Sequence, residues 1–275
     1  MTVGIVGLGL IGGSFAKAYQ EAGATVLAWN RSRSVLDFAI MSGAVDAELT
    51  EDNIAACDLV LIALYPEATI EWFRRMAPHI GAHPVVLDCG GTKRTICAAC
   101  FPIAKEHGVT FLGGHPMAGT QYSGFKNAKA TMYHGAPMVI VPPDFDDVLL
   151  FDHVKQLLQP AGFARFSFTT AEAHDEMIAF TSQMAHVVSN AYIKSPTASQ
   201  HKGFSAGSYK DLTRVAKLNE TMWSELFLCN AEPLACEIDE IIRHLDEYRR
   251  VIRAGDRQTL TELLREGRIR KENLG

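Results

Sequence analysis

The sequence predicts an α/β fold, in which a Rossmann-type, doubly wound parallel sheet is followed by an all-helical C-terminal domain. In the first half of the chain, short apolar runs alternate with longer amphipathic stretches. The runs are nearly continuous in Val, Ile and Leu, which is typical of parallel strands covered on both faces. After residue 169 these runs stop and apolar residues recur at helical spacing. We therefore expect two domains, at residues 1–169 and 170–275.

The expected elements follow in chain order. The apolar runs predict strands at residues 3–6, 24–29, 59–64, 84–87, 109–112, 137–141 and, as the weakest run, 164–168. Helical spacing predicts helices in the second domain at residues 172–193, 208–217 and 233–254. The last of these carries one apolar stripe, formed by Leu234, Ile238, Ile241, Leu245, Tyr248 and Ile252. Such a stripe needs a partner, which is either another helix of the same chain or a second copy in a homodimer.

The composition is that of an ordinary soluble globular protein. Of the 275 residues, 48% are hydrophobic and 21% are charged, and the formal net charge is −5. Nucleic acids and anionic membranes select clustered basic surface, so neither partner is expected, and an anionic small-molecule substrate needs locally placed cations. No apolar run approaches the roughly 18 residues of a membrane span, and the N-terminus lacks the basic start of a signal peptide. We expect a cytoplasmic protein.

Six cysteines are scattered through the chain, and a cytoplasm would keep them reduced. Cys97 and Cys100 form a C-x-x-C pair, but no second Cys or His pair stands at metal-ligand spacing. We interpret the pair as two thiols on one helix rather than as a zinc or redox site. No metal is expected.

The first expected strand runs directly into a glycine-rich turn, G-L-G-L-I-G at residues 7–12. A G-x-G-x-x-G turn between a strand and a helix is typical of dinucleotide binding. Gly7 permits the tight turn, Gly9 lets the backbone approach a pyrophosphate, and Gly12 lets the helix pack on the strand. The N–H groups of Leu10 and Ile11 open the helix and face the anion. The first domain is therefore predicted to bind a nicotinamide dinucleotide.

The second expected strand leads into Asn30, Arg31 and Ser32. At this point an NAD enzyme usually offers a carboxylate to the adenosine ribose. This chain offers an amide, a guanidinium and a hydroxyl, which suit the 2′-phosphate of NADP. The sequence therefore favours NADP over NAD. In the other interpretation, Arg31 is a solvated turn residue and the protein accepts either nucleotide.

Two further motifs follow expected strands, D-C-G-G-T-K at residues 88–93 and G-G-H-P-M-A-G-T at residues 113–120. Loops at the carboxyl ends of parallel strands line the ligand crevice of such a sheet. His115 stands between two glycines and a proline, which restrict the turn that carries it. A largely neutral imidazole suits a general base near pH 7. His115 is accordingly either such a base or a structural histidine.

The helical domain offers one cation and one uncharged stripe. Arg214 lies among apolar residues of the expected helix at 208–217, as a ligand for a carboxylate or as an ordinary surface charge. Ala179, Gln183, His186 and Asn190 share one side of the expected helix at 172–193. This stripe faces either solvent or the cleft between the domains, and its lack of charge favours the cleft.

Together these motifs resemble the prephenate/arogenate dehydrogenases of tyrosine biosynthesis. The similarity runs in order through G-L-G-L-I-G-G-S at residues 7–14, D-x-G-x-x-K at 88–93, H-P-M-A-G-T at 115–120, the pair His174-Asp175, and K-D-L-T-R at 210–214. H-P-M-A-G-T is the most specific of these motifs. The resemblance implies a nicotinamide-dependent oxidoreductase that oxidises and decarboxylates prephenate to 4-hydroxyphenylpyruvate, or, alternatively, arogenate to tyrosine.

The resemblance also implies roles for single residues. His115 would accept the proton of the ring hydroxyl, Arg214 would hold a substrate carboxylate, and His186 would help to place the substrate. Family members often have a serine that hydrogen-bonds the catalytic histidine where this chain has Gly91, and Thr92 is the expected substitute. The neutral Gln121 favours prephenate over arogenate.

A second departure from the family pattern is Gln183, which stands where many members have another histidine.

Two other classes of protein share the expected plan of a nucleotide-binding domain followed by a helical domain. NADP-linked hydroxyacid dehydrogenases and imine reductases resemble one another in placing a catalytic lysine on the first interdomain helix, which has none here before Lys194. A dinucleotide sensor without catalysis would need neither His115 nor Arg214.

Overall fold

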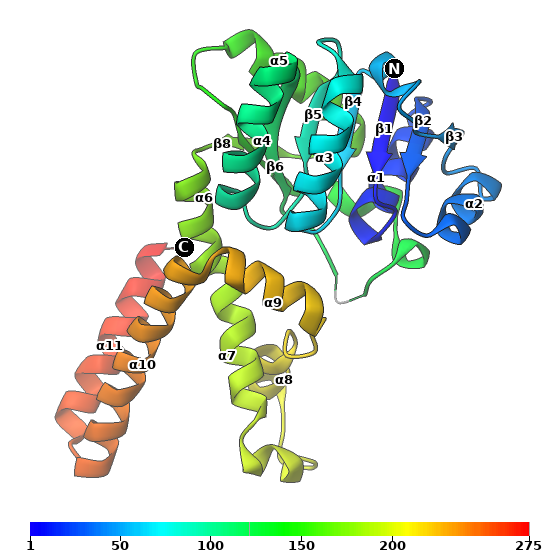
Figure 1. Cartoon of the computed structure of the whole chain (residues 1–275). Helices are drawn as coiled ribbons and strands as arrows, with labels where there is room; N and C mark the ends of the chain where they lie inside the picture. The colour runs from blue at the N-terminus through cyan, green and yellow to red at the C-terminus, as the bar shows by residue number, and fades with distance from the viewer. Residues whose placement is uncertain (121, 275) are drawn as a thin grey trace. The chain divides into compact units, whose positions relative to one another are not determined.

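The computed structural model describes residues 1–120 and 122–274. Among these residues, eight strands form one sheet in the order β3-β2-β1-β4-β5-β6-β7-β8 (Figure 1). Neighbouring strands are parallel except β6 and β7, which confirms the doubly wound, mostly parallel sheet. The strands are β1 (Thr2–Val6), β2 (Thr25–Trp29), β3 (Ala47–Glu48), β4 (Leu59–Ile62), β5 (Val85–Asp88), β6 (Thr110–Pro116), β7 (Pro137–Val141) and β8 (Arg165–Phe168).

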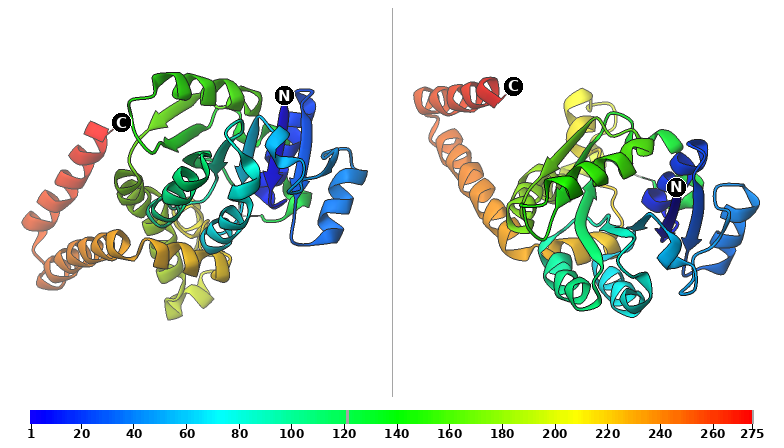
Figure 2. Two further views of the ribbon diagram at one scale, coloured as in Figure 1. Left: turned by 45° about the horizontal axis from the view of Figure 1, so that its top comes forward. Right: turned by 90° about the horizontal axis from the view of Figure 1, so that it is seen from above.

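Helices cover both faces of the sheet (Figure 2). Alternate residues of a strand point to opposite faces, so each central strand contributes to two apolar layers. Leu59 and Leu61 pack in the layer with α1 and α5, whereas Val60 and Ile62 pack in the layer with α3 and α4. The helices of this half are α1 (Leu10–Glu21), α2 (Arg33–Met41), α3 (Pro66–Ile80), α4 (Arg94–His107) and α5 (Val148–Leu158). This two-sided burial explains why the strands are nearly continuous in apolar residues.

All the predicted strands are present, but the strand expected at 109–112 is longer than its apolar run. β6 extends to Pro116 because it changes partner, pairing with β5 in parallel up to Leu112 and with β7 in antiparallel from Gly113. The expectation that His115 lies on a loop after the strand was therefore wrong. His115 pairs with Val139 inside the strand. The short edge strand β3 was not predicted from the sequence.

The helix predicted at 172–193 is present, with one irregular turn. It consists of α6 (Ala171–Ile178), a π-helical turn at Ala179–Gln183, and α7 (Met184–Ile193). Two shorter helices follow, α8 (Gly207–Thr213) and α9 (Glu220–Cys229). The helix α9 was not predicted from the sequence; its start is capped by Asn219 through a hydrogen bond from the Met222 N–H.

Contacts divide the chain into two compact units, Met1–Asn230 and Ala231–Gly275. The domain boundary expected after residue 169 is a different division, based on element type, and it stays a prediction. The second unit contains α10 (Ala231–Ala254), as predicted, and α11 (Arg257–Leu274), which the sequence analysis missed. Gly255 ends α10 with a φ of +68°, and Asp256 caps the start of α11.

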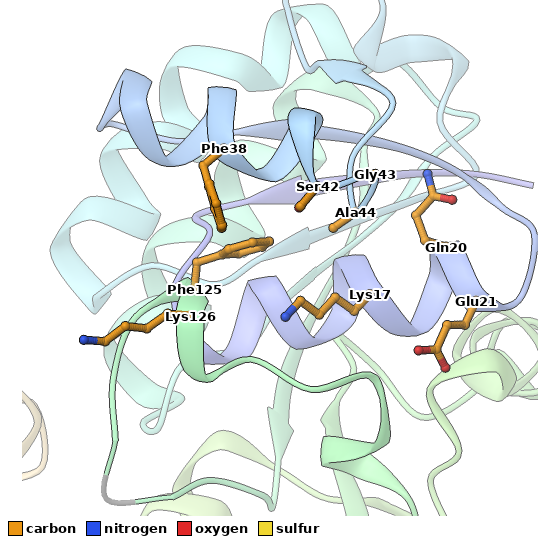
Figure 3. Close-up of a pocket in the computed structure, with 9 residues that line it drawn as sticks. All are labelled: Lys17, Gln20, Glu21, Phe38, Ser42, Gly43, Ala44, Phe125 and Lys126. Carbon is orange, nitrogen blue, oxygen red and sulfur yellow. The ribbon is translucent and has the colours of Figure 1, made fainter.

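A cavity of about 490 Å³ opens between α1, α2 and the turn at Phe125–Asn127 (Figure 3). Phe38 and Phe125 meet edge to face across it, with ring centroids 6.0 Å apart. The Lys17 ammonium donates to the Ala128 carbonyl at 2.7 Å and lies over the Phe125 ring. Of the predicted site residues that the structure describes, none lines this cavity.

No helix in the described part of the chain combines the length and the apolar character needed to cross a membrane.

The apolar layer under α3 and α4 is predicted to dominate stability. Phe73 is fully buried, and its ring centroid lies 4.7 Å from that of Phe111 in β6. Phe73→Ala leaves a large cavity and should lower the free energy of unfolding by about 3–5 kcal/mol, measured by denaturant titration. Phe204→Ala is the control, because Phe204 is 92% exposed and its loss should cost no more than about 0.5 kcal/mol. Equal effects of the two substitutions would contradict this assignment of the core.

Candidate active site

The turn between β1 and α1 has the geometry of a phosphate-binding loop. Gly7 has a φ of +92°, which an L side chain rarely adopts, and its N–H donates to Trp29 O at 2.8 Å. A Cβ on Gly12 would lie 1.9 Å from Gly7 O, so no side chain fits there. A Cβ on Gly9 would meet nothing within 4 Å. The space above Gly9, at the N-terminus of α1, therefore fits the close approach of a pyrophosphate.

The end of β2 is joined to this turn by the side chain of Asn30. Its Oδ1 accepts from the Leu8 N–H at 2.9 Å, and its Nδ2 donates to Ser32 O at 3.0 Å. Asn30 thus positions the phosphate loop, a role that the sequence analysis did not foresee. Ser32 is the residue before the first turn of α2, so free N–H groups begin where the strand ends.

Two guanidiniums near the end of β2 differ in their surroundings. Arg33 Nε lies 2.8 Å from Asp37, and Arg33 Nη1 lies 2.5 Å from Glu48. Arg31 is exposed, and within the described residues no ion pair occupies it. The guanidinium of Arg31 is therefore the one available to a ligand.

A buried ion pair connects the segments that follow β5 and lead into His115. The Asp88 carboxylate accepts from the Lys93 ammonium, and both side chains are fully buried. The same carboxylate accepts from Gly90 N at 2.8 Å and from Gly114 N at 3.1 Å. Gly114 must lack a side chain, because a Cβ would lie 2.4 Å from Asp88 O. The backbone on the N-terminal side of His115 is therefore fixed.

His115 is partly buried near the end of β6, where its Nδ1 lies 2.9 Å from His174 Nε2. His174 Nδ1 lies 2.7 Å from Asp175 Oδ1, and both of these residues of α6 are buried. The His174-Asp175 pair is visible in the sequence as a motif, but its contact with His115 was not predicted. The contact spans 59 positions, so no local spacing pattern could reveal it.

The surroundings keep both imidazoles neutral near pH 7. Desolvation is the largest effect on His115, and with the charges of His174 and Lys93 it holds the pKa of His115 well below its usual value. Burial also lowers the pKa of His174, although the hydrogen bond with Asp175 opposes this shift. A neutral His115 can accept a proton.

Three positions that the sequence singles out, Thr92, Gly91 and Gln121, differ in their outcome. Thr92 is fully buried, and its hydroxyl has no hydrogen-bond partner among the described residues, so the geometry does not favour contact with a substrate. A Cβ on Gly91 would meet the Leu226 side chain at 3.4 Å, which is ordinary contact. Gln121 lies outside the described residues.

The predicted residues of the helical region form a second group. His186 Nδ1 lies 3.2 Å from Val215 O, and its ring centroid is 3.8 Å from that of Trp223. Burial lowers the pKa of His186, and the nearby charge of Arg214 lowers it further. Arg214 itself is exposed, at the end of α8. This half-buried imidazole beside an exposed guanidinium suits an anionic ligand.

The uncharged stripe of the α6–α7 helix does not face solvent. Gln183 Nε2 donates to Leu226 O at 3.0 Å, and Asn190 Nδ2 donates to Ala216 O at 3.4 Å. With the contact of His186, these bonds attach the stripe to the segment that contains α9. Among the described residues, no hydrogen bond or ring contact joins this group directly to His115, so the fold forms two clusters rather than one.

The C-x-x-C pair lies on α4, as predicted. Cys97 and Cys100 are buried free thiols, and burial raises the pKa of Cys100 to about 12. Burial raises the pKa of Cys97 as well. Among the described residues, no group of three or more His, Cys, Asp or Glu side chains is arranged to hold a metal ion.

Two family models match the chain in succession. Residues 15–166 match the nucleotide-binding domain of prephenate dehydrogenase, and residues 170–266 match the prephenate dehydrogenase dimerization domain. The chain belongs to the prephenate dehydrogenase family. This confirms the resemblance found in the sequence. The first match begins after the glycine-rich turn, so the assignment of that turn depends on its geometry.

Individual relatives are similar over nearly the whole chain. A prephenate dehydrogenase of Bacillus subtilis (strain 168) is 28% identical, covering 94% of this chain and 72% of the relative. A cyclohexadienyl dehydrogenase of Zymomonas mobilis is 27% identical, covering 96% of this chain and 92% of the relative. The structure of Aquifex aeolicus prephenate dehydrogenase with hydroxyphenyl propionate and NAD+ has a TM-score of 0.82 at 24% identity, covering 100% of this chain and 98% of that chain. At that identity the likeness supports the fold.

The open space above Gly9 predicts that Gly9→Ala separates binding from stability. Because an added Cβ meets no protein atom, the free energy of unfolding should change by no more than about 0.5 kcal/mol. The same Cβ would stand where the pyrophosphate approaches, so the dissociation constant for nicotinamide dinucleotide should rise at least about tenfold, measured by calorimetry. Gly267→Ala, which also meets no atom within 4 Å but lies in α11, should leave binding unchanged. Unaltered affinity in Gly9→Ala would place the nucleotide elsewhere.

Proposed function

We propose that this protein is an NADP-linked prephenate dehydrogenase, which oxidises and decarboxylates prephenate to 4-hydroxyphenylpyruvate in tyrosine biosynthesis. The observation that carries the proposal is the placement of His115. In a chain of this family, a neutral, partly buried imidazole stands near the end of β6, where its neighbours fix it. A general base needs these properties.

In the proposed reaction, the residues of the chain position the substrate and move one proton. The imidazole of His115 accepts the proton of the ring hydroxyl as hydride leaves the same carbon. The β1–α1 turn would hold the dinucleotide, whose nicotinamide would supply the hydride acceptor. Loss of the ring carboxylate as CO2 makes the ring aromatic and drives the reaction, so alignment is the main task of the protein.

We assign Arg214 and His186 of the helical region to binding the carboxylates of the substrate. The exposed guanidinium of Arg214 can donate paired hydrogen bonds to one carboxylate. His186, packed on Trp223, presents a partly buried imidazole beside it. Arogenate carries an amino group where prephenate has a keto group, and no described residue here decides between them. Arogenate dehydrogenase activity is therefore the second candidate, and the assay must include both substrates.

The nucleotide preference is assigned to Arg31. It is exposed and without an ion pair among the described residues, beside the N-terminus of α2, and no carboxylate follows β2 directly. A guanidinium and free N–H groups favour the extra phosphate of NADP. The preference therefore depends on a single exposed side chain.

The helical region is also assigned to homodimer formation. The matching family model is described as a dimerization domain. Within the second unit, Leu245 and Ile252 of the predicted apolar stripe are each 60% exposed, as is Leu264 of α11 at 58%. Exposed apolar side chains on a helical pair suit burial against a second copy. A cytoplasmic location stays a prediction.

The experiment that tests the function follows the absorbance of reduced nicotinamide. Purified protein is mixed with NADP or NAD, and prephenate or arogenate is offered to each. Reduction with prephenate, accompanied by release of CO2, is expected. Reduction with arogenate alone would select the second candidate. Absence of reduction in every mixture, with nucleotide binding intact, would overturn the proposal and favour a hydroxyacid dehydrogenase or imine reductase, and after these a dinucleotide sensor.

His115→Asn should lower kcat by about 10²- to 10⁴-fold, because the proton acceptor is removed while the shape near the backbone is kept. The dissociation constant for NADP should change little, since His115 is not part of the phosphate loop. Steady-state kinetics and calorimetry measure the two effects. His134→Asn, an exposed histidine elsewhere in the same unit, should leave kcat unchanged. A near-normal kcat in His115→Asn would remove it as the base.

Arg31→Ala should raise the KM for NADP about tenfold to a hundredfold, the value of a charge-assisted hydrogen bond to phosphate. The KM for NAD should change far less. Arg33→Ala is the matched control, because that guanidinium is already paired with Asp37 and Glu48. An equal rise in the KM for NADP and for NAD in Arg31→Ala would show that this residue does not bind the 2′-phosphate.

Arg214→Ala should act on the substrate and not on the nucleotide. The KM for prephenate should rise at least about tenfold, because one charge-assisted contact with a carboxylate is lost. The KM for NADP should stay the same. Lys217→Ala removes an exposed cation nearby in the chain and serves as the control. An unchanged KM for prephenate in Arg214→Ala would mean that the carboxylate is held elsewhere.

A further inference from the structure

We propose that His174 and Asp175 act as positioning residues, which hold His115 in the tautomer whose Nε2 is free to accept a proton. The inference rests on the proposed function of His115 as the base. It deepens that function by naming the accepting atom and the groups that select it. The contacts that carry it are His115 Nδ1 to His174 Nε2 at 2.9 Å and His174 Nδ1 to Asp175 Oδ1 at 2.7 Å.

The direction of each hydrogen bond follows from Asp175. Its Oδ1 accepts from the Lys93 N–H at 2.7 Å and its Oδ2 from the Arg94 N–H at 2.9 Å, and backbone amides can only donate. An ionised carboxylate only accepts, so His174 Nδ1 carries the hydrogen that bonds to Oδ1.

A neutral imidazole has one N–H, so the Nε2 of His174 is then bare and accepts. The bond at 2.9 Å therefore requires the hydrogen on His115 Nδ1. The Nε2 of His115 is consequently bare, in the state that a proton acceptor needs.

The charges around the pair are consistent with two neutral rings. Burial has the largest effect on both rings and disfavours a proton on each, and the Lys93 ammonium acts in the same direction on both. A positive charge on His174 would also disfavour a proton on His115. Asp175 and, at greater remove, Asp88 act in the opposite direction on His174. Both rings are therefore neutral, and one arrangement of their hydrogens satisfies every contact.

The relay, defined as His115, His174 and Asp175, is anchored to three elements. Asp175 is attached to the N-terminus of α4 by the two backbone amides, and its carbonyl accepts from Asn230 Nδ2 at 2.8 Å. His174 lies in the first turns of α6, which Thr170 caps through the Ala173 N–H. His115 lies in β6. The imidazole is thereby fixed in rotation as well as in tautomer.

The relay also affects the charge that forms during the reaction. When His115 Nε2 takes the hydroxyl proton, the ring becomes an imidazolium that still donates from Nδ1 to His174. The Asp175 carboxylate then stands two hydrogen bonds away from the new positive charge. The proton remains on His115 Nε2 until solvent removes it, so no transfer along the relay is required.

The first test determines the tautomer directly, without substrate. In protein labelled with nitrogen-15 at histidine, the resonances of His115 are assigned by their loss in His115→Asn. A protonated Nδ1 and a bare Nε2 are expected near pH 7. A protonated Nε2, or a charged ring, would overturn the relay. Because this measurement needs no turnover, it gives its answer even if the protein oxidises neither candidate substrate.

The second test compares two substitutions of His174. His174→Leu removes both contacts and should lower kcat at least about tenfold, because His115 then samples the inactive tautomer. The KM for prephenate and the dissociation constant for NADP should stay within twofold. His174→Gln can reach the position of Nε2 with its amide oxygen, accept from His115 and restore most of the kcat.

A matched control separates positioning from stability. Tyr19→Phe removes a buried hydrogen bond of similar length, from Tyr19 to Leu157 O at 2.8 Å, and should lower the unfolding temperature without changing kcat. Equal kcat in wild type and His174→Leu would overturn the proposal. So would equal losses in His174→Leu and His174→Gln while both remain folded, because Gln keeps the contact that the relay depends on.

Discussion

The buried ion pair between Asp88 and Lys93 is the interaction on which the rest of the site depends. Both side chains are fully enclosed, and breaking one partner of such a pair typically costs about 3–5 kcal/mol. The Asp88 carboxylate also holds Gly114, the residue before His115. The backbone of Lys93 holds Asp175, which contacts His174 and, through it, His115. The contacts form a closed ring, so the pair fixes the histidine from both sides.

This ring explains why charged groups are retained where apolar ones would pack as well. Replacing a buried ion pair by hydrophobic residues is often neutral or stabilising, so stability alone does not account for Asp88 and Lys93. An apolar pair could not accept the Gly90 and Gly114 amides, which would be left buried without partners. The buried polar contacts between β5 and β6 thus fix both the segment after β5 and the segment that leads into His115. A proton acceptor requires such a fixed geometry.

The sequence was sufficient where the signal is local. Continuous apolar runs identified the strands because burial on both faces demands them, and G-x-G-x-x-G identified the first turn because only glycine fits beside Gly7 O. Sequence patterns did not predict the features that depend on contacts between residues far apart in the chain. The partner change of β6 placed His115 inside a strand, and the contact with His174 depends on how α6 meets the sheet. The strongly charged α11 lacked the apolar pattern that revealed α10.

The departure at Gly91 acquires a physical meaning from these contacts. A side chain is not excluded there, because a Cβ would make ordinary contact with Leu226. Because residue 91 is glycine, this position offers no hydroxyl to His115. The Thr92 hydroxyl does not take its place, because it is buried without a partner among the described residues. The described partner of His115 Nδ1 is then His174. In this chain the orientation of the proposed base is therefore set from the helical side, by α6, and not by the segment after β5 that carries Gly91.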